Sequence, residues 1–254
     1  EVLANHKVSV GPPFYNSVII PIVIVFLLFM AIGPKINWIK NNKNDLILFT
    51  KIFTLAIFID FFIIFFFKSL SVISNFILIS AFFLIISSIL DLLKISSDKK
   101  QGLSRVTSHL SFGFLVLFIG LNYNFSLEKD FNLKLGEKKL FNDYSLEFKD
   151  IKLQEFKNYK AVIGEFKINN PKKKIEHLLF PEIRIYENPQ TITYEASIRT
   201  SLLKDYYITM SNIDRSEYYN VKFQKKPFMM WIWISVLFIS FGGFLRMFKN
   251  GKNY

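Results

Sequence analysis

The chain has 254 residues, of which 51% are apolar and 30 are phenylalanine, and it carries 32 Lys and Arg against 20 Asp and Glu, a formal net charge of +12. The apolar residues gather in five stretches, whereas residues 126–226 hold 34 of the 52 charges, which excludes both a single soluble globule and a disordered polyelectrolyte. Cysteine is absent, which excludes disulfides, thiolate metal sites and a cysteine nucleophile, and Glu1 in place of Met leads us to expect a piece of a longer or processed product.

The five apolar stretches are long enough to cross a bilayer as helices, which takes roughly 20 residues at about 1.5 Å each. Only Lys68 and Ser69 separate the second stretch from the third, which predicts a tight helical hairpin. Trp231 and Trp233, near the start of the fifth, predict an aromatic anchor at the membrane interface. The stretches span residues 17–34, 46–67, 70–93, 106–125 and 227–248.

The basic residues of the short loops set the predicted orientation. Lys and Arg gather between the first and second stretches, between the third and fourth, and after the fifth, whereas the loop between the second and third holds a single lysine. The positive-inside rule therefore places the N-terminal segment and residues 126–226 outside and the C-terminus inside. The inside residues are Lys35, Lys40, Lys43, Lys51, Lys94, Lys99, Lys100, Arg105, Arg246, Lys249 and Lys252.

Eleven of the 32 basic residues thus flank the spans on the inside, where they suit anionic lipid headgroups, and nothing predicts a nucleic-acid partner. No stretch interleaves aromatic and basic residues in the manner of a groove for single-stranded nucleic acid. The run Lys172–Lys174 follows an Asn-Asn-Pro turn and is interpreted as a solvated loop tip, with contact to an acidic partner or to headgroups as the alternative.

Residues 126–226 change to an alternation of apolar and polar residues, the pattern of half-buried strands. About seven short strands separated by turn residues predict a small antiparallel sandwich or barrel. The alternating residues are Leu146 and Phe148; Ile183 and Ile185; Ile192, Tyr194, Ala196 and Ile198 within Thr191–Arg199; Tyr206, Ile208 and Met210; and Tyr219, Val221 and Phe223.

The predicted fold is therefore a polytopic α-helical membrane protein with about five transmembrane helices and one small all-β extracytoplasmic domain inserted before the last helix. Residues 1–125 form the transmembrane region, residues 126–226 the β-domain, and residues 227–254 the last transmembrane helix and an inside tail.

Of the three histidines, His6 and His177 are interpreted as surface residues, whereas His109 lies about one turn inside a predicted membrane helix. An ionisable side chain at that depth is costly unless it has a partner. Two readings stay open: a neutral imidazole bonded to a neighbouring helix, or an axial haem ligand. Ser108, Ser111 and Gly113 would let a flat macrocycle approach the helix in the second case, but the chain offers no second membrane histidine.

Two acidic residues also lie within predicted spans. Asp60, in the middle of the second, is a candidate for a proton relay, while Asp91 is interpreted as a charge at a helix end. We find no catalytic triad, phosphate loop, metal-ligand cluster or pair of carboxylates at a cleft. The chain by itself is not expected to be an enzyme, so any chemistry must come from a bound cofactor or from missing parts.

Four groups of motifs follow one another along nearly the whole chain. They read VSVGPPFYN at Val8–Asn16; RVTSHLSFG at Arg105–Gly113; PEIRIY, TYEASI and KDYY at Pro181–Tyr186, Thr193–Ile198 and Lys204–Tyr207; and KPF, WIW and GG at Lys226–Phe228, Trp231–Trp233 and Gly242–Gly243. Together they resemble the C-terminal portion of the cytochrome c maturation protein F (CcmF) family, the large subunit of the system I cytochrome c haem lyase. The chain departs from the family pattern at Ile183, where a lysine is usual, and at Ser111, where a glycine is usual.

The resemblance implies a function in cytochrome c biogenesis, in the inner membrane of a bacterium or a mitochondrion. It implies that His109 is one axial ligand of a membrane haem b whose second ligand lies upstream, together with the tryptophan-rich motif that presents haem. The implied partners are apocytochrome c, a haem chaperone, thiol-handling subunits, the N-terminal part of the same protein and quinol.

Glu182, Arg184 and Asp205 are the residues we expect to make domain or partner contacts, although they could equally solvate the polar face of the sheet. The main alternative function is a non-catalytic membrane scaffold whose outside β-domain recruits a partner. A transporter fragment is the third, and only Asp60 favours it.

Overall fold

The computed structural model describes residues 12–36, 43–67, 70–94, 100–173, 175–212 and 216–247. His6, the first residues of the Val8–Asn16 motif, the Lys68-Ser69 linker and Lys174 lie outside these ranges, as do Lys40, Lys99, Lys249 and Lys252. The chain divides into two compact units, one built from the residues up to Asn124 together with those from Trp231 onward, and one from Phe125 to Met230.

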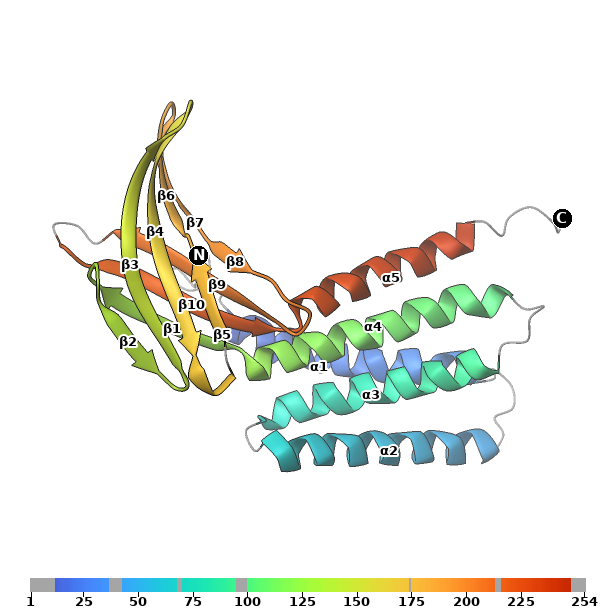
Figure 1. Ribbon diagram of the computed structural model, residues 1–254. Helices are drawn as coiled ribbons and strands as arrows, with labels where there is room; N and C mark the ends of the chain where they lie inside the picture. Colours follow the sequence, from blue (N-terminus) through green and yellow to red (C-terminus); the bar gives the residue numbers. More distant parts are fainter. Residues whose placement is uncertain are drawn as a thin grey trace, which may run out of the picture. The chain divides into compact units, whose positions relative to one another are not determined.

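The described part of the first unit is helical, and five of its helices are long and apolar enough to cross a membrane (Figure 1). Each coincides with a predicted stretch, and the bounds differ by up to six residues. The helices are α1 (Pro12–Ile32), α2 (Lys43–Phe67), α3 (Val72–Leu93), α4 (Lys100–Phe125) and α5 (Met229–Met247), and α1 continues into the short 3₁₀ helix η1 (Gly33–Lys35).

Capping and backbone geometry account for two of the boundaries. The hydroxyl of Ser71 accepts a hydrogen bond from the Ser74 N–H at 3.2 Å, which satisfies one of the free donors at the start of α3. The sequence predicts that Pro227 opens the last helix. In the structure Pro227 closes a strand instead, and Phe228 adopts a positive φ of 61°, so α5 begins at Met229.

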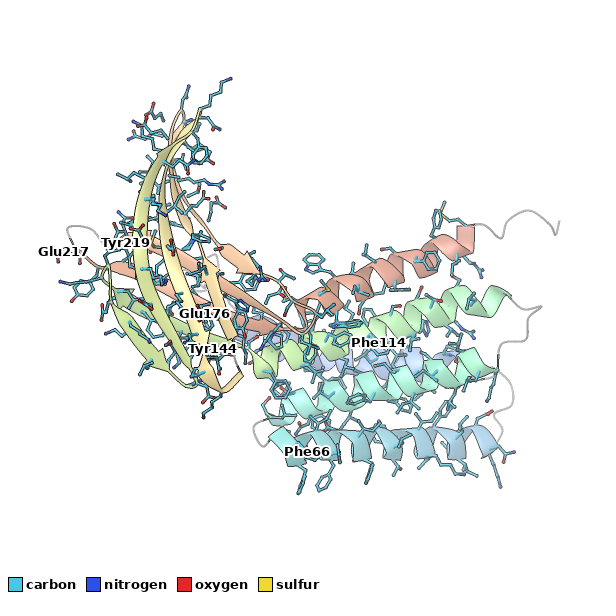
Figure 2. All side chains as sticks on the ribbon, viewed as in Figure 1. Phe66, Phe114, Tyr144, Glu176, Glu217 and Tyr219 are labelled. Atoms are coloured by element: carbon cyan, nitrogen blue, oxygen red, sulfur yellow. The ribbon has the colours of Figure 1, made fainter. Side chains whose placement is uncertain are left out.

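Helix α3 packs against both α1 and α2 and supplies five of the eleven buried residues in the apolar core of this unit, more than any other helix. Leu78, Ala81 and Leu84 have no exposed surface. The outer face of α2 is instead rich in exposed phenylalanines, among them Phe66 in Figure 2. A large exposed apolar face is expected of a helix in contact with lipid.

The second unit contains ten strands among the described residues, three more than the alternation predicts. They are β1 (Leu127–Leu133), β2 (Lys138–Phe141), β3 (Tyr144–Glu155), β4 (Tyr159–Asn170), β5 (Ile175–Leu179), β6 (Glu182–Glu187), β7 (Gln190–Glu195), β8 (Ser197–Arg199), β9 (Lys204–Asn212) and β10 (Tyr219–Pro227). A short 3₁₀ helix, η2 (Pro171–Lys173), links β4 to β5.

The strands form two antiparallel sheets with the orders β1-β10-β9-β8 and β2-β3-β4-β6-β7, and β5 pairs with β4. Side chains of both sheets share one buried core, so the predicted sandwich is confirmed (Figure 1). Phe148 and Phe166 stack in it from the larger sheet, with ring centroids 4.4 Å apart, and Ile208 and Phe223 enter it from the smaller one.

The alternating run Thr191–Arg199 reads as one segment in the sequence, but the structure breaks it at Ala196. Strand β7 pairs with β6 in the larger sheet, whereas β8 pairs with β9 in the smaller one, so the chain crosses between sheets at this point. Ile192 and Tyr194 remain half exposed because β7 is the outermost strand in the order of its sheet. Alternation identifies the two faces of a strand but not whether a second layer covers one of them.

Candidate functional site

His109 lies on α4, nine residues or about 13 Å from the start of the helix, and it is half-buried. The backbone carbonyl of Met30 on α1 accepts a hydrogen bond from the imidazole. This bond engages one ring nitrogen, so the other is the atom that could act as an acceptor or bind iron.

Charged residues from two helices lie near this histidine, and a third element is linked to them. Arg105 on α4 and Asp91 on α3 are close enough to interact with it electrostatically. Asp91 in turn pairs with Lys35 of η1, with the ammonium nitrogen 3.2 Å from the carboxylate. His109 therefore stands at the edge of a small ionic network near one end of the helical unit.

Lys35 is tied to α3 by more than its ion pair. Its ammonium group donates to the carbonyl of Ser87 at 3.1 Å and also contacts the Ser87 hydroxyl, which itself donates to the carbonyl of Ala31 at 2.9 Å. The Lys35 and Asp91 side chains are only 12% and 17% exposed. The sequence indicates a loop charge at Lys35 and a helix-end charge at Asp91, and the structure joins the two across two helices. Both residues lie at the predicted inside ends of their spans, and this shared position is the sequence feature that could have indicated the pair.

The small residues around His109 serve helix packing. A side chain at Gly113 would meet Ile85 Cγ1 at 2.7 Å, so this glycine lets α4 approach α3. Gly242 of α5 lies directly against Ser108, and the Ser104 hydroxyl donates to the Gly242 carbonyl at 2.7 Å. The expectation that Ser108 and Gly113 leave room for a macrocycle is therefore wrong for these faces of α4, because other helices occupy them.

A histidine can hold a haem iron through one ring nitrogen while a hydrogen bond at the other orients the ring, and His109 with the Met30 carbonyl offers this arrangement. The described residues contain no group of three or more His, Asp and Glu side chains that could hold a metal ion. Among the described residues, the donors thus suit a haem held through His109 and form no site for a metal ion held by protein ligands alone.

Asp60 is 2% exposed, and its Oδ1 has no hydrogen-bond partner among the described residues. It shares one face of α2 with Ile52 and Ala56, which are buried in the helical core. A charged carboxylate is costly in such a place. Within the described ranges, the structure brings no second ionisable group to this carboxyl, and the proton relay stays a prediction.

Glu182 and Arg184 lie side by side on β6. The Arg184 Nε donates to Glu182 Oε2 at 2.8 Å, and this bond raises the pKa of the guanidinium above its usual range. The guanidinium also lies over the ring of Tyr159 on β4, 5.0 Å from its centroid. Both charges are thus partnered on one face of the larger sheet, and their contact with another protein stays a prediction.

Asp205 lies on the other sheet, away from that pair, and is only 5% exposed. Its carboxylate accepts from the Ser201 N–H at 3.2 Å and from the Tyr207 hydroxyl at 3.4 Å. Burial raises the pKa of Tyr207, and the charge of Asp205 raises it further. In the structure, Asp205 organises the loop that precedes β9.

A cluster that the sequence does not single out lies in the β-unit. The hydroxyls of Tyr144 and Tyr206 are 3.4 Å apart in the buried core, and the ring of His177 lies against Tyr206 with centroids 5.6 Å apart. The surface interpretation of His177 is therefore incomplete. The only indication in the sequence is that His177 lies within a short, mostly apolar segment.

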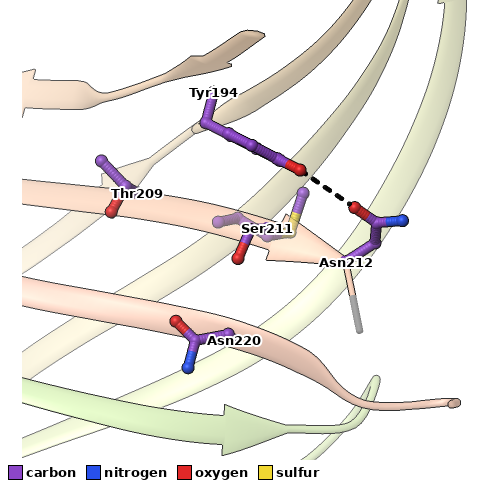
Figure 3. Close-up of a pocket in the computed structure, with 6 residues that line it drawn as sticks. Tyr194, Thr209, Ser211, Asn212 and Asn220 are labelled. Carbon is purple, nitrogen blue, oxygen red and sulfur yellow. Dashed lines mark hydrogen bonds between the residues drawn. The ribbon is translucent and has the colours of Figure 1, made fainter. Parts of the chain in front are cut away.

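The β-unit also has a pocket of about 320 Å³ between β7 and the strands β9 and β10 (Figure 3). Its lining offers hydroxyl and amide groups, with the Tyr194 hydroxyl donating to Asn212 Oδ1 at 3.4 Å. Among the described residues, no carboxylate, imidazole or ammonium group lines it, so it provides no evident acid, base or nucleophile. The lining residues are Tyr194, Thr209, Met210, Ser211, Asn212 and Asn220.

Comparison with known proteins agrees with the observed fold of the β-unit and the helices. Residues 124–227 match the family model described as the CcmF C-terminal beta-sandwich. The cytochrome c-type biogenesis protein CcmF of Escherichia coli K12 is 24% identical over 252 residues, and that of Haemophilus influenzae is 27% identical over 264 residues. Residues 124–227 thus carry the C-terminal beta-sandwich of the CcmF family, and nearly the whole chain is similar to the C-terminal portion of CcmF proteins.

The CcmF relatives are much longer than the chain. The matches cover 97% and 98% of the chain but only 39% of the E. coli protein and 40% of the H. influenzae protein. A solved structure described as the cytochrome c haem lyase CcmF shares the fold, with a TM-score of 0.74, 16% identity, and coverage of 92% of this chain and 40% of that one. The five long apolar helices of the described residues, together with these relatives, indicate an integral membrane protein.

Proposed function

We propose that the chain is the C-terminal part of a haem lyase subunit for cytochrome c biogenesis and that it helps attach haem to apocytochrome c. Its relatives are described as cytochrome c-type biogenesis proteins, and the protein of known structure that shares its fold is described as a haem lyase. The observation that carries the proposal is His109, half-buried in a membrane helix with one ring nitrogen bonded to Met30.

In this proposal His109 would hold a membrane haem b as one of the ligands of its iron. Such a haem, when bound, would supply single electrons. The Met30 carbonyl fixes the orientation of the imidazole, and the Lys35–Asp91 pair holds α1 against α3 beside it. These residues would therefore keep the ligand nitrogen in one position while the rest of the site is supplied from outside the chain.

We also propose partners for the chain and an orientation in the membrane. The partners are apocytochrome c, a haem chaperone, thiol-handling subunits, quinol and the N-terminal part of the same family protein. The β-unit would lie outside a bacterial or mitochondrial inner membrane and the C-terminus inside. The distribution of Lys and Arg between the short loops supports this orientation.

The optical spectrum of the assembled protein tests the haem ligand. In His109→Ala we expect the bands of a low-spin b-type haem to be lost, because one axial ligand is gone. His177→Ala is the matched control, since this histidine lies in the β-unit and packs on Tyr206, and it should keep the spectrum. Retention of the full spectrum in His109→Ala would contradict the proposal.

A non-catalytic scaffold is the second candidate function, and the bond from His109 to Met30 favours it, because this bond already satisfies part of the buried imidazole. A scaffold would show no haem bands at all, or bands that do not change in His109→Ala. The same spectra therefore separate the two functions.

A further inference from the structure

The loop between β8 and β9 exposes two adjacent leucines. Leu202 and Leu203 are 65% and 63% exposed, although their neighbours Asp205 and Tyr206 are buried. Two large aliphatic side chains side by side in water are unfavourable, because each leaves apolar surface hydrated. Leu202 and Leu203 therefore present a continuous apolar surface to the surroundings of the β-unit.

Hydrogen bonds hold this loop in one conformation. The Ser201 hydroxyl donates to the Lys204 carbonyl at 2.5 Å, and the Ser201 N–H donates to the buried carboxylate of Asp205 at 3.2 Å. A side chain that bonds the backbone a few residues away fixes a tight turn. The two leucines thus form the tip of a built turn.

The tip is attached next to a membrane-spanning helix. The Phe228 N–H donates to the Leu203 carbonyl at 3.0 Å, and Phe228 directly precedes Met229, the first residue of α5. Helix α5 is long and apolar enough to cross a bilayer. This hydrogen bond and the continuity of the chain therefore keep Leu203 next to the first residue of α5.

Cations accompany the two leucines. Arg199 ends β8 and Lys204 begins β9, on either side of the tip, and Lys226 on β10 pairs in register with Asp205. Residues 199–204 contain no acidic residue, and the next one, Asp205, is buried. The surface around the tip thus combines apolar side chains with positive charge, which matches the interface of an anionic bilayer.

We propose that Leu202 and Leu203 insert into the headgroup region of the bilayer beside α5, with Arg199 and Lys204 contacting anionic lipid headgroups. The β-unit then has a lipid contact of its own in addition to its covalent links to the helices. This inference does not depend on haem binding or on any partner of the proposed haem lyase.

The absence of cysteine from the chain makes a direct test possible. The full chain carrying Leu202→Cys is labelled with an environment-sensitive fluorophore and placed in nanodiscs of phosphatidylcholine and phosphatidylglycerol, with or without a nitroxide-labelled lipid. Leu153→Cys is the matched control, because Leu153 is a leucine of the same unit that is 83% exposed, on β3. Both substitutions are at exposed positions, so far-UV circular dichroism should match the parent chain.

We expect blue-shifted emission at position 202 and roughly three-fold stronger quenching by the nitroxide lipid than at position 153, as for a side chain about 5–10 Å into the interface. Equal quenching at the two positions would overturn the proposal. Blue-shifted emission at 202 without lipid quenching would also overturn it, since protein would then cover the tip. In the Arg199→Gln, Lys204→Gln double variant we expect weaker quenching at position 202. Unchanged quenching would show that these two cations do not contribute to the lipid contact.

Discussion

His177 shows how the fold changes the chemistry of a single residue in the β-unit. Burial lowers the pKa of His177 below its usual range, and the neighbouring Arg199 and Lys204 act in the same direction. The ring lies against Tyr206, whose hydroxyl pairs with Tyr144 in the core. The folded state therefore favours the neutral imidazole, and protonation acts against the packing of β5.

This arrangement predicts that part of the stability of the β-unit depends on pH. A pKa lower in the folded than in the unfolded state contributes stability above the usual histidine pKa of about 6.5, and this contribution is lost as the pH falls through that range. His177→Phe keeps an aromatic ring at Tyr206 and removes the titration. We expect the melting temperature of the full chain to fall less between about pH 8 and pH 6 in this variant than in the parent.

The difference between the two chains is the informative quantity in that experiment. Hydrogen bonds to lysines lower the pKa of several carboxyls, including Glu128 and Glu176, so acid also weakens these pairs in both chains. Identical pH profiles of parent and His177→Phe would show that the imidazole does not contribute.

At the scale of elements, the contact between α4 and α5 depends on one glycine. A Cβ atom at Gly242 would lie 2.9 Å from the Ser108 backbone nitrogen and 3.2 Å from the Ser104 carbonyl oxygen. A Cβ atom at the next residue, Gly243, would meet no described atom within 4 Å. The two glycines therefore have different roles, although they are adjacent in the sequence.

Substitution of each glycine by alanine should separate these roles. Gly243→Ala is expected to stabilise α5 by up to about 1 kcal/mol, because alanine has the higher helix propensity. Gly242→Ala is expected to destabilise the helical unit by roughly 1–3 kcal/mol, because the added methyl group forces the two helices apart. Thermal unfolding of the full chain in detergent measures both effects, and equal effects of the two substitutions would contradict the close contact.

At the scale of the molecule, the chain holds a helical unit with one candidate haem ligand and a β-unit attached to it through α4 and α5. It spans about 40% of the length of its CcmF relatives. The predicted spans contain one histidine, His109, so the proposed six-coordinate haem needs a ligand from another polypeptide or from the upstream part of the protein.

Reconstitution should therefore depend on the missing portion. The chain purified alone is expected to show no low-spin b-type spectrum, and co-expression with the N-terminal part of a CcmF relative is expected to restore it. A complete low-spin spectrum from the chain alone would instead indicate that two copies, or an unexpected residue, provide the second ligand. The readout is the difference spectrum of reduced minus oxidised protein.

The sequence by itself determined the features that depend on composition and periodicity. Five stretches such as Leu46–Phe67 are too long and apolar for anything but membrane helices, and the alternation at Tyr206, Ile208 and Met210 identifies the buried face of a strand. Both signals are local, because bilayer thickness and the pleat of a strand impose them on every residue in turn. His109 stood out for the same reason, as an ionisable group where composition allows almost none.

Only the tertiary structure decided which distant groups meet. The bond from His109 to Met30, the Lys35–Asp91 pair and the close approach of Gly242 to Ser108 join helices that are far apart in the sequence. The crossing at Ala196 and the burial of Asp205 likewise depend on which strands pair. Such contacts arise from packing between elements, and no local pattern encodes them, because each side chain could face several neighbours until the helices and sheets are assembled.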